Sequence, residues 1–363
     1  MTDQTEIAHV LGAIADPYNG ASLESLGAIK ALTVAGSKVQ VSLELGYPAA
    51  KDERLAGQVQ QALMALDGID EVDLDLSWRV VAHPAANSAQ AVPGVKNIIA
   101  VASGKGGVGK STTAANLALA LAAEGARVGM LDADIYGPSQ PQILGVGQRR
   151  PNIVGEGKAQ QMVPIEAHGL QTISMGYLVT EQTPMVWRGP MVSGALKQLL
   201  SQTRWDELDY LIIDMPPGTG DIALTLSQSV PVTGSVIVTT PQDIALLDAV
   251  KGIEMFRKVH VPVLGVIENM ATHVCSDCGH KEAIFGAGGG ERIARDYNTE
   301  LLGQLPLTMA VREQADSGRP SVVADPDSDV AQTYRTIALK MAACLWRENQ
   351  AAAPTTILTS VDD

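Results

Sequence analysis

Short apolar runs alternate with longer amphipathic segments in the part of the chain that follows residue 97. The apolar runs are continuous, which is typical of strands that are buried on both faces of a parallel sheet. Strands are predicted at residues 98–103, 128–132, 211–214, 235–240 and 263–269, with a short one near Leu302. The intervening segments have helical spacing, so the pattern predicts an α/β fold with a doubly wound, mostly parallel sheet.

The first eighty residues follow a different pattern. Helices are predicted at 5–15 and 50–66, and strand-like periodicity covers 25–35 and 39–45. From residue 72 to residue 77, apolar residues alternate with acidic or polar ones, which indicates a half-buried strand with an acidic outer face. The carboxylates here could also form a cation site, but alternation with period two favours a solvated face.

These patterns divide the chain into four parts. A small α+β domain is predicted at 1–81, a linker at 82–96, a larger α/β domain at 97–350 and a tail at 351–363. The linker is rich in Ala and Pro, and the segment AHPAANSAQAVPGV within it carries no charge. The first eighty residues hold twelve acidic and five basic side chains, so half of the net charge of −14 lies there.

The overall composition excludes some classes of function. A net charge of −14 and an aromatic content of 4% argue against a nucleic-acid binder, which needs a basic face or stacking platforms. The longest charge-free stretch, 222–242, contains two prolines and many polar residues, so no membrane span is expected. The acidic start MTDQTEIAHV is unlike a signal peptide, and three cysteines form no disulfide framework. We therefore expect a cytoplasmic protein.

The segment from Gly104 to Ser111 matches the phosphate-loop pattern G-x-x-x-x-G-K-[ST] at every fixed position. An apolar strand precedes it and a helix-forming run follows it, which is the context that this motif requires. Lys110 is predicted to reach the β- and γ-phosphates, and the Ser111 hydroxyl to ligate Mg²⁺. The other predicted nucleotide-binding residues are Gly104, Lys105, Gly106, Gly107, Val108, Gly109 and Thr112.

A second lysine, Lys105, follows the first glycine of this loop. The sequence GKGGVGKST resembles the deviant phosphate loop of dimeric ATPases such as the septum-site, plasmid-partition, arsenite-pump and nitrogenase iron proteins. In that group the extra lysine crosses the dimer interface to the nucleotide of the partner. The resemblance implies a catalytic role for Lys105 in trans, like that of an arginine finger.

Two further strand ends carry acids. The carboxyl ends of parallel strands line the ligand crevice of an open α/β sheet, so these acids are expected near the phosphate loop. Asp214 has the form of a Walker B acid that holds Mg²⁺, and Asp134 is the candidate for orienting the attacking water. Gly218 is predicted to contact the γ-phosphate. For Asp132 and Asp221, a helix-capping role is as good an interpretation as a functional one.

Asn269 lies at the end of a predicted strand, in the run Val-Ile-Glu-Asn-Met. It resembles the residue that recognises the adenine edge in the same ATPase group. The chain contains no N-K-x-D run for guanine recognition. The predicted nucleotide is therefore ATP rather than GTP.

Cys275 and Cys278 form a C-x-x-C pair just beyond that strand. The third cysteine, Cys344, falls in a helical apolar pattern and is predicted to pack in a core. The pair could form a zinc site with His273 and His280, or a redox disulfide. It could also supply half of the four thiolates of a [4Fe–4S] cluster shared by two copies of the chain. The small number of ligands and the dimer that Lys105 implies favour the cluster.

The motifs GKGGVGKST, DADIYGPS, DMPPGTGD, ENM and C-x-x-C occur here in the order found in the Mrp/ApbC family of ATP-binding iron–sulfur cluster carriers. The resemblance covers about residues 97–347, and residues 5–80 resemble the iron–sulfur assembly module that often precedes that domain. The family segment often has a cysteine where this chain reads LGYPAA at 45–50. Its absence here puts a cluster role for the N-terminal domain in question.

The resemblance implies a homodimeric ATPase with ATP, Mg²⁺ and a [4Fe–4S] cluster. It would receive the cluster from scaffold proteins and pass it to apo iron–sulfur proteins, without nucleic-acid or membrane partners. One alternative is a partitioning or positioning ATPase, but the acidic composition and the tail provide no basic surface or amphipathic helix for it. Another is a zinc-stabilised module with a structural nucleotide site.

Overall fold

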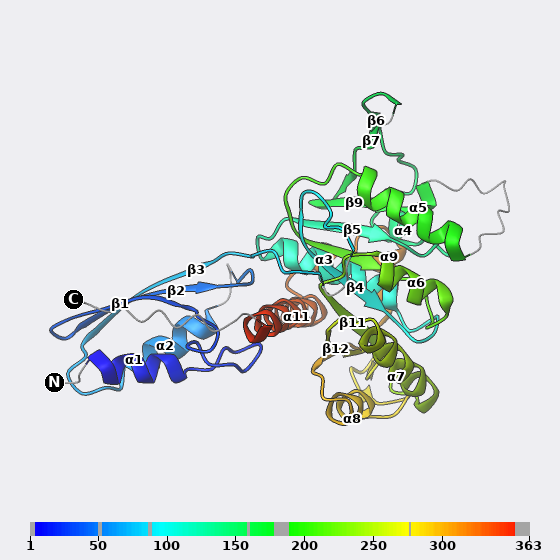
Figure 1. Cartoon of the computed structure of the whole chain (residues 1–363). Helices are drawn as coiled ribbons and strands as arrows, with labels where there is room; N and C mark the ends of the chain where they lie inside the picture. The colour runs from blue at the N-terminus through cyan, green and yellow to red at the C-terminus, as the bar shows by residue number, and fades with distance from the viewer. Residues whose placement is uncertain are drawn as a thin grey trace. The chain divides into compact units, whose positions relative to one another are not determined.

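The computed structural model describes residues 4–49, 53–85, 89–157, 160–177, 189–275 and 277–352. The chain divides into two compact units (Figure 1). One consists of the residues up to Arg79 together with the chain from Ala342 onward, and the other runs from Val80 to Met341. The predicted tail begins within the last helix, and its residues from 353 onward lie outside the described part.

The larger unit is built on an eight-stranded sheet in the order β15-β12-β11-β4-β10-β5-β9-β8. All neighbouring strands are parallel except β8 and β9 at one edge, which are antiparallel. The strands are β4 (Val95–Ala102), β5 (Val128–Asp132), β8 (Ile165–Ala167), β9 (Leu170–Ser174), β10 (Leu208–Asp214), β11 (Gly234–Thr239), β12 (Val263–Glu268) and β15 (Leu301–Gln304).

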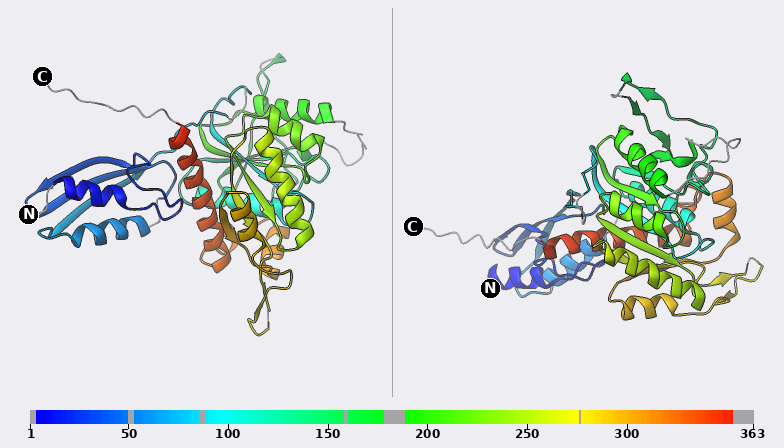
Figure 2. Two further views of the ribbon diagram at one scale, coloured as in Figure 1. Left: turned by 60° about the horizontal axis from the view of Figure 1, so that its bottom comes forward. Right: turned by 45° about the vertical axis from the view of Figure 1, so that its right-hand side comes forward.

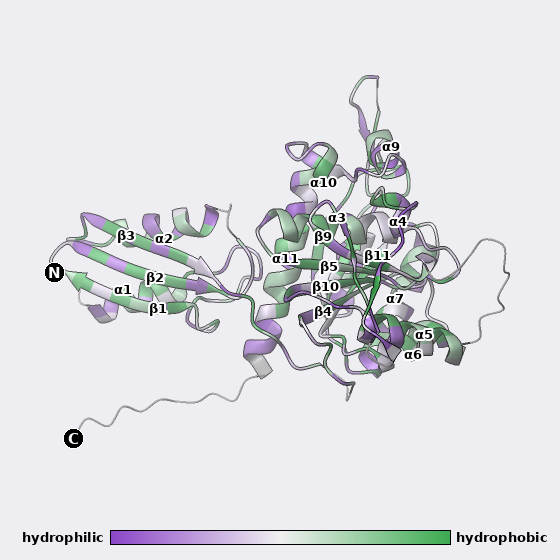
Figure 3. Cartoon of the chain, turned by 90° about the horizontal axis from the view of Figure 1, so that it is seen from above, coloured by the Kyte–Doolittle hydropathy of each residue, from purple (hydrophilic) through white to green (hydrophobic). Residues whose placement is uncertain are grey.

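Helices cover both faces of this sheet, as expected of a doubly wound fold. Every residue of β10 and of β5 is buried, and the central strands are accordingly coloured hydrophobic in Figure 3. On one face the core joins the sheet to α5–α8, while α3 packs against β5 and β10. The helices are α3 (Lys110–Ala123), α4 (Gln140–Ile143), α5 (Gly189–Gln202), α6 (Asp221–Ser229), α7 (Asp243–Lys258), α8 (Gly289–Asp296), α9 (Met309–Asp316), α10 (Ser321–Ala324) and α11 (Asp329–Ala352), with a short 3₁₀ turn at Met175–Tyr177.

The predicted fold class is confirmed, and each of the six predicted strands is present. Strands β8 and β9 were not predicted, because the segment 165–174 mixes apolar and polar residues without a continuous apolar run. Two small antiparallel ribbons were also not predicted: β6 (Ile153–Val154) with β7 (Gln161–Met162), and β13 (His273–Val274) with β14 (Lys281–Glu282). Strands of two residues are too short for periodicity to reveal.

The smaller unit contains a three-stranded sheet, β1 (Ile29–Ala35), β2 (Lys38–Leu45) and β3 (Glu71–Trp78), with β1 and β2 antiparallel and β2 and β3 parallel. Helices α1 (Gln4–Ala13) and α2 (Arg54–Met64) complete it. Exposed and half-buried residues alternate along the whole of β3, so the predicted strand with an acidic outer face is confirmed. Glu71 there pairs with Lys38 of β2 across 2.6 Å, which fits a solvated face.

The end of α11 belongs to this smaller unit. The ring of Trp346 lies 5.8 Å from that of Tyr47, and a Cβ added at Gly46 would lie 2.3 Å from the indole. The Asn19 side chain donates to the carbonyl of Ala343 across 3.0 Å. The predicted boundary at residue 350 thus differs from the structure, which groups the chain from Ala342 with the N-terminal residues. Cys344 is 1% exposed, as predicted for a core residue.

Among the described residues, no helix combines the length and the apolar character needed to cross a lipid bilayer.

Candidate nucleotide site and cysteine ribbon

The phosphate loop connects the end of β4 to the start of α3 at Lys110, in the strand–loop–helix arrangement that its sequence predicts. Gly107 and Gly109 both have φ of +81°, a region that favours glycine. Gly104 is required for another reason, because an added Cβ would lie 2.2 Å from the backbone of Asp248 in α7. The loop therefore places its backbone N–H groups and the amino end of α3 together, as an anion site requires.

Lys110 and Asp214 form a buried ion pair beneath this loop. Lys110 is 6% exposed and Asp214 is fully buried at the end of β10. The ammonium of Lys110 also donates to the Ser111 hydroxyl across 3.2 Å. The two predicted Mg²⁺ ligands, Ser111 and Asp214, are thus within reach of one cationic group. A hydroxyl and a carboxylate are hard oxygen donors, so this set fits Mg²⁺.

A second buried carboxylate, Asp132, faces Asp214 from the neighbouring strand β5, in direct register. Asp132 accepts hydrogen bonds from the Ser174 hydroxyl and from the backbone N–H of Gln140, both at 3.0 Å. Burial, together with the charge of Asp214, raises the pKa of Asp132 to about 7. Asp132 anchors α4 by accepting its first backbone N–H, but the N-cap of this helix is Ser139 and not Asp132.

Asp134 is 8% exposed and accepts from the backbone N–H of Tyr136 at 3.3 Å and of Gly137 at 3.2 Å. One of its oxygens therefore organises the loop after β5, and its role toward water stays a prediction. Asp221 begins α6 and is exposed, with Gly220 as the N-cap. Asp221 is therefore not the N-cap that the sequence suggested as an alternative, although its charge in the first turn fits the helix dipole.

Gly218 and Asn269 both lie against the phosphate loop. The N–H of Gly218 donates to the carbonyl of Ser103 at 2.9 Å, and its φ is +91°. The amide of Asn269 donates to the carbonyl of Val108 at 2.8 Å. The structure thus brings both residues to the predicted site. Asn269 here supports the loop backbone, and its recognition of adenine stays a prediction.

The predicted cysteine pair lies in the turn of the β13–β14 ribbon, which projects from the larger unit as a hairpin (Figure 2). The N–H of Cys275 donates to the carbonyl of His280 at 2.9 Å, and the N–H of Gly279 donates to the carbonyl of Cys275 at 3.0 Å. Backbone N–H groups of Cys278 and Asp277 point at the sulfur of Cys275 and lower the pKa of its thiol. The turn therefore favours a thiolate, which is the form that binds metals.

The described side chains at this turn do not complete a metal site within one chain. Cys275 is half-buried and Cys278 is exposed. Within the described ranges, no three His, Cys, Asp or Glu side chains are gathered closely enough to hold a metal ion. His273 and His280 therefore do not complete a zinc site with the cysteines in this structure. Thiolates are soft ligands that suit zinc and iron–sulfur clusters, so the two cysteines fit half of such a site.

Helix α7 connects the phosphate loop to the surroundings of the cysteine ribbon. Its residue Asp248 packs on Gly104, and its first residue, Asp243, pairs with Arg292 of α8 across 3.2 Å. The backbone carbonyl of Pro241, just before α7, lies 3.9 Å from the position of a Cβ at Gly286, in the loop that follows the ribbon. Helix α7, together with Pro241 before it, thus lies next to both the phosphate loop, at Gly104, and the loop that follows the ribbon, at Gly286. A shift of the phosphate loop would therefore act on the helix that supports the loop after the ribbon.

Two buried residues of this region were not predicted. Glu268, at the end of β12, accepts from the N–H of Gly290 at 2.8 Å and from the Gln304 amide at 2.6 Å, so it fixes the start of α8. Gln140 contacts both Ser111 and Asp214. The signal that could have revealed them is a polar residue within a motif, as Glu268 is in ENM, or directly after one, as Gln140 is after DADIYGPS; this signal does not identify the partner residue.

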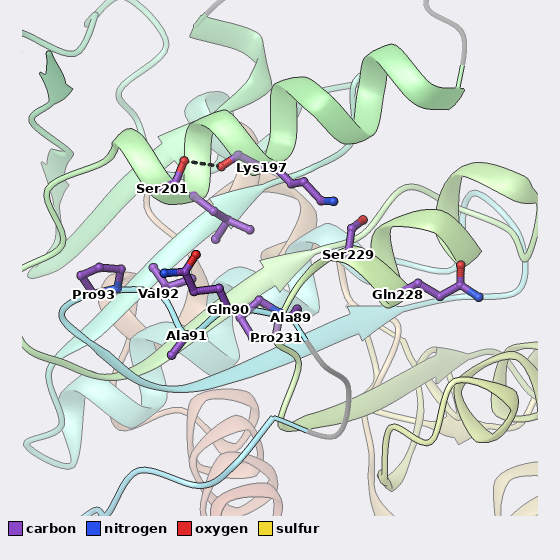
Figure 4. Close-up of a pocket in the computed structure, with 11 residues that line it drawn as sticks. Ala89, Gln90, Ala91, Val92, Pro93, Lys197, Ser201, Gln228, Ser229 and Pro231 are labelled. Carbon is purple, nitrogen blue, oxygen red and sulfur yellow. Dashed lines mark hydrogen bonds between the residues drawn. The ribbon is translucent and has the colours of Figure 1, made fainter. Parts of the chain in front are cut away.

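A separate pocket of about 560 Å³ lies away from these residues (Figure 4). It is formed by the segment 89–93 and by the carboxyl-terminal parts of α5 and α6. Of its lining residues only Lys197 is charged, and none is a predicted site residue. The nucleotide chemistry predicted from the sequence thus resides at the phosphate loop and not in this pocket.

A family model described as NUBPL iron-transfer P-loop NTPase matches residues 94–342. The chain belongs to this family. The predicted family resemblance is thereby confirmed, and the match ends next to Met341, where the larger unit of this NTPase ends. A second model, described as iron-sulfur cluster assembly protein, matches residues 4–74 of the smaller unit.

Relatives and solved structures agree with this assignment. The NTPase is 61% identical over 282 residues to an iron-sulfur cluster carrier protein of Pseudomonas fragi, which covers 77% of this chain and 97% of the relative. It is 51% identical over 347 residues to the carrier protein of Escherichia coli K12, with 94% and 93% covered.

Among solved structures, an ADP complex of a nucleotide-binding protein from Archaeoglobus fulgidus matches with a TM-score of 0.56 at 36% identity. That match covers 65% of this chain and 90% of the other. The cell division ATPase MinD of Pyrococcus furiosus matches with a TM-score of 0.50 at 23% identity, over 68% and 98% of the two chains. The MinD likeness shows the fold alone, so it does not favour a positioning function.

Proposed function

We propose that this NTPase is an ATP-hydrolysing carrier that binds a [4Fe–4S] cluster between two copies of the chain and transfers it to apo iron–sulfur proteins. Its donors would be cluster scaffold proteins, and its compartment the cytoplasm. The observation that carries the proposal is the turn at Cys275 and Cys278. It favours a thiolate yet supplies only two ligands, in a chain whose relatives are named cluster carriers.

The cluster is the cargo in this proposal, and its ligand requirement dictates a dimer. A [4Fe–4S] cluster takes four thiolates, so Cys275 and Cys278 of each of two chains complete one site. A two-fold axis passing between the ribbons would generate this arrangement, because a symmetric dimer presents the same groups from both sides. An exposed turn suits a cargo that has to leave again.

The surface beside the phosphate loop supports a second copy as the partner. Ile244 and Leu247 of α7 are 71% and 65% exposed, one turn apart, and Leu247 adjoins the residue that packs on Gly104. Ile284, in the loop after the ribbon, is 48% exposed. Two large apolar side chains exposed one turn apart on a helix are typical of an interaction surface. Lys105 lies next to Gly104, so a copy that covers α7 would bring the partner's loop near it.

Most of the groups that phosphoryl transfer needs would come from one chain. Mg²⁺, when bound, neutralises charge on the β- and γ-phosphates, and Ser111 and Asp214 would hold it. Lys110 would exchange its carboxylate partner for the phosphates, and the N–H of Gly218 would exchange the Ser103 carbonyl for the γ-phosphate. Asp134 would orient the attacking water, while Lys105 of the second copy would stabilise charge on the transferred group.

Under this proposal, α7 couples the nucleotide state of the phosphate loop to the affinity of the two ribbons for the cluster. This helix touches the phosphate loop at Gly104 and supports α8 through Asp243. A loop that closes on nucleotide would move α7 and so change the spacing of the two ribbons. Equal rates of cluster transfer with and without Mg-ATP would contradict this coupling.

Purification without oxygen tests the proposal. The wild-type protein is expected to be a brown dimer that contains iron and sulfide, and Cys278→Ser is expected to lose both while it still binds ATP. Cys344→Ala is the matched control, because Cys344 is buried in the other unit and is expected to leave the cluster intact. One firmly held zinc ion per chain, without iron, would instead support a zinc-stabilised module.

A further inference from the structure

Gln140 is a buried polar residue that the sequence motifs do not explain. It is the first residue of α4 and is 2% exposed. Its backbone N–H donates to Asp132 at 3.0 Å, which fixes its main chain at the carboxyl edge of the sheet. Its side chain is therefore held in the same layer as the predicted Mg²⁺ ligands.

The side-chain amide of Gln140 contacts both of those ligand residues. Its Nε2 donates to the backbone carbonyl of Ser111 and to Oδ2 of Asp214, each at 2.9 Å. Lys110 occupies the other oxygen, Oδ1, of the same carboxylate. Both neighbours of Nε2 are acceptors, so the orientation of the amide is determined by its surroundings.

The carbonyl oxygen of the same amide is buried and has no hydrogen-bond partner in the described part of the chain. Buried carbonyl oxygens nearly always receive a hydrogen bond, so such an atom needs an explanation. It belongs to a residue that holds Asp214 and Ser111, where a hydrated cation is expected. Mg²⁺ in nucleotide sites keeps several of its waters, and these are strong hydrogen-bond donors.

We infer that Gln140 is a positioning residue of the Mg²⁺–nucleotide site, which orients Asp214 through its amide nitrogen and accepts a hydrogen bond from the hydrated cation through its carbonyl oxygen. The inference rests on the proposed nucleotide function. Gln140 would connect the loop after β5 to the Mg²⁺ site, because it is the first residue of α4 and this helix directly follows that loop.

Binding of nucleotide to the full-length protein with and without Mg²⁺ tests this role. The dissociation constant of ADP is measured by calorimetry in Mg²⁺ and in EDTA, for wild type, Gln140→Leu and Gln140→Met. The Mg²⁺-dependent gain in affinity is expected to fall about tenfold in both variants, with an affinity in EDTA that changes less than about twofold. Gln142→Leu is the matched control, because Gln142 lies on the same short helix and bonds to Asp316 instead.

Two results would overturn the inference. Gln140→Leu could keep the full Mg²⁺-dependent gain, or it could lose affinity equally in Mg²⁺ and in EDTA, as a purely structural residue would. Gln140→Met keeps about the same side-chain length without either amide group, so it decides the question if the leucine variant does not fold. A wild-type protein that binds no nucleotide would refute the proposed function itself, which is a different outcome from either of these.

Discussion

The phosphate loop and the cysteine ribbon differ in how much of a site one chain supplies. Around the loop, Lys110, Asp214 and Asp132 are buried and bonded to partners from several strands and helices of the same chain. At the ribbon, two cysteines lie in a turn that is partly or fully exposed. In the described residues, one chain gathers the predicted nucleotide-site groups but only two cysteines at the ribbon. Under the proposed function, binding of the cluster therefore depends on assembly of two chains, whereas nucleotide binding does not.

The largest expected effect is on hydrolysis. Asp214→Asn removes the carboxylate that would hold Mg²⁺ and leaves the Lys110 ammonium without its anionic partner, so the rate of ATP hydrolysis should fall by roughly a hundredfold. Iron content should not change, since the ribbon is a separate site. Asp221→Asn is the control, because Asp221 is exposed at the start of α6. Loss of iron along with hydrolysis would contradict the separation of the two sites.

The second prediction concerns substitutions on α7 that should prevent dimer formation without changing the nucleotide site. Ile244→Asp combined with Leu247→Asp puts two charges on the apolar surface of α7, so iron bound per chain should fall about tenfold and light scattering should report a monomer. The affinity for Mg-ADP should stay within about twofold of wild type. Ile153→Asp, which changes an isoleucine 65% exposed on the other ribbon, should remain dimeric and keep its iron. A dimer that survives the double substitution would show that the interface lies elsewhere.

A third prediction concerns the packing of the loop on α7. Gly104→Ala places a Cβ 2.2 Å from the Asp248 backbone, so the unfolding free energy should fall by about 1–3 kcal/mol and nucleotide affinity should weaken. A Cβ at Gly106 meets nothing within 4 Å, so the unfolding free energy of Gly106→Ala should stay close to that of wild type. Urea denaturation and calorimetry of the two variants measure both effects. Equal stability of the pair would mean that Gly104 and α7 are not packed as described.

The smallest effect is a pH dependence of stability. The pKa of Asp132 is raised to about 7 in the fold, so this carboxyl takes up a proton on folding. The unfolding free energy of the nucleotide-free protein should therefore decrease as the pH rises from about 4, the range of an unfolded carboxyl, to about 7. Asp132→Asn should flatten this decrease by about 1–3 kcal/mol in urea denaturation between these pH values. Parallel curves for wild type and variant would contradict it.

Features that depend on residues adjacent in the sequence could be predicted from it. The phosphate loop, the strands β4, β5 and β10 and the alternation in β3 follow from local patterns, and the structure reproduces them. Other features depend on partners that are distant in sequence. The contact of Gln140 with Asp214 and the packing of Trp346 on Tyr47 cannot be read from periodicity. Asn269 illustrates the limit, because it was predicted to belong to the nucleotide site as the adenine-recognising residue, but its bond to the carbonyl of Val108 was not predicted.

Native mass spectrometry of the reconstituted protein, under strict exclusion of oxygen, tests the central claim most directly. If two chains share one site, the spectrum should show a dimer that carries a single [4Fe–4S] cluster, and monomers without metal. Cys275→Ser should abolish the cluster-bearing dimer. A cluster or a zinc ion bound stoichiometrically to each single chain would contradict the account.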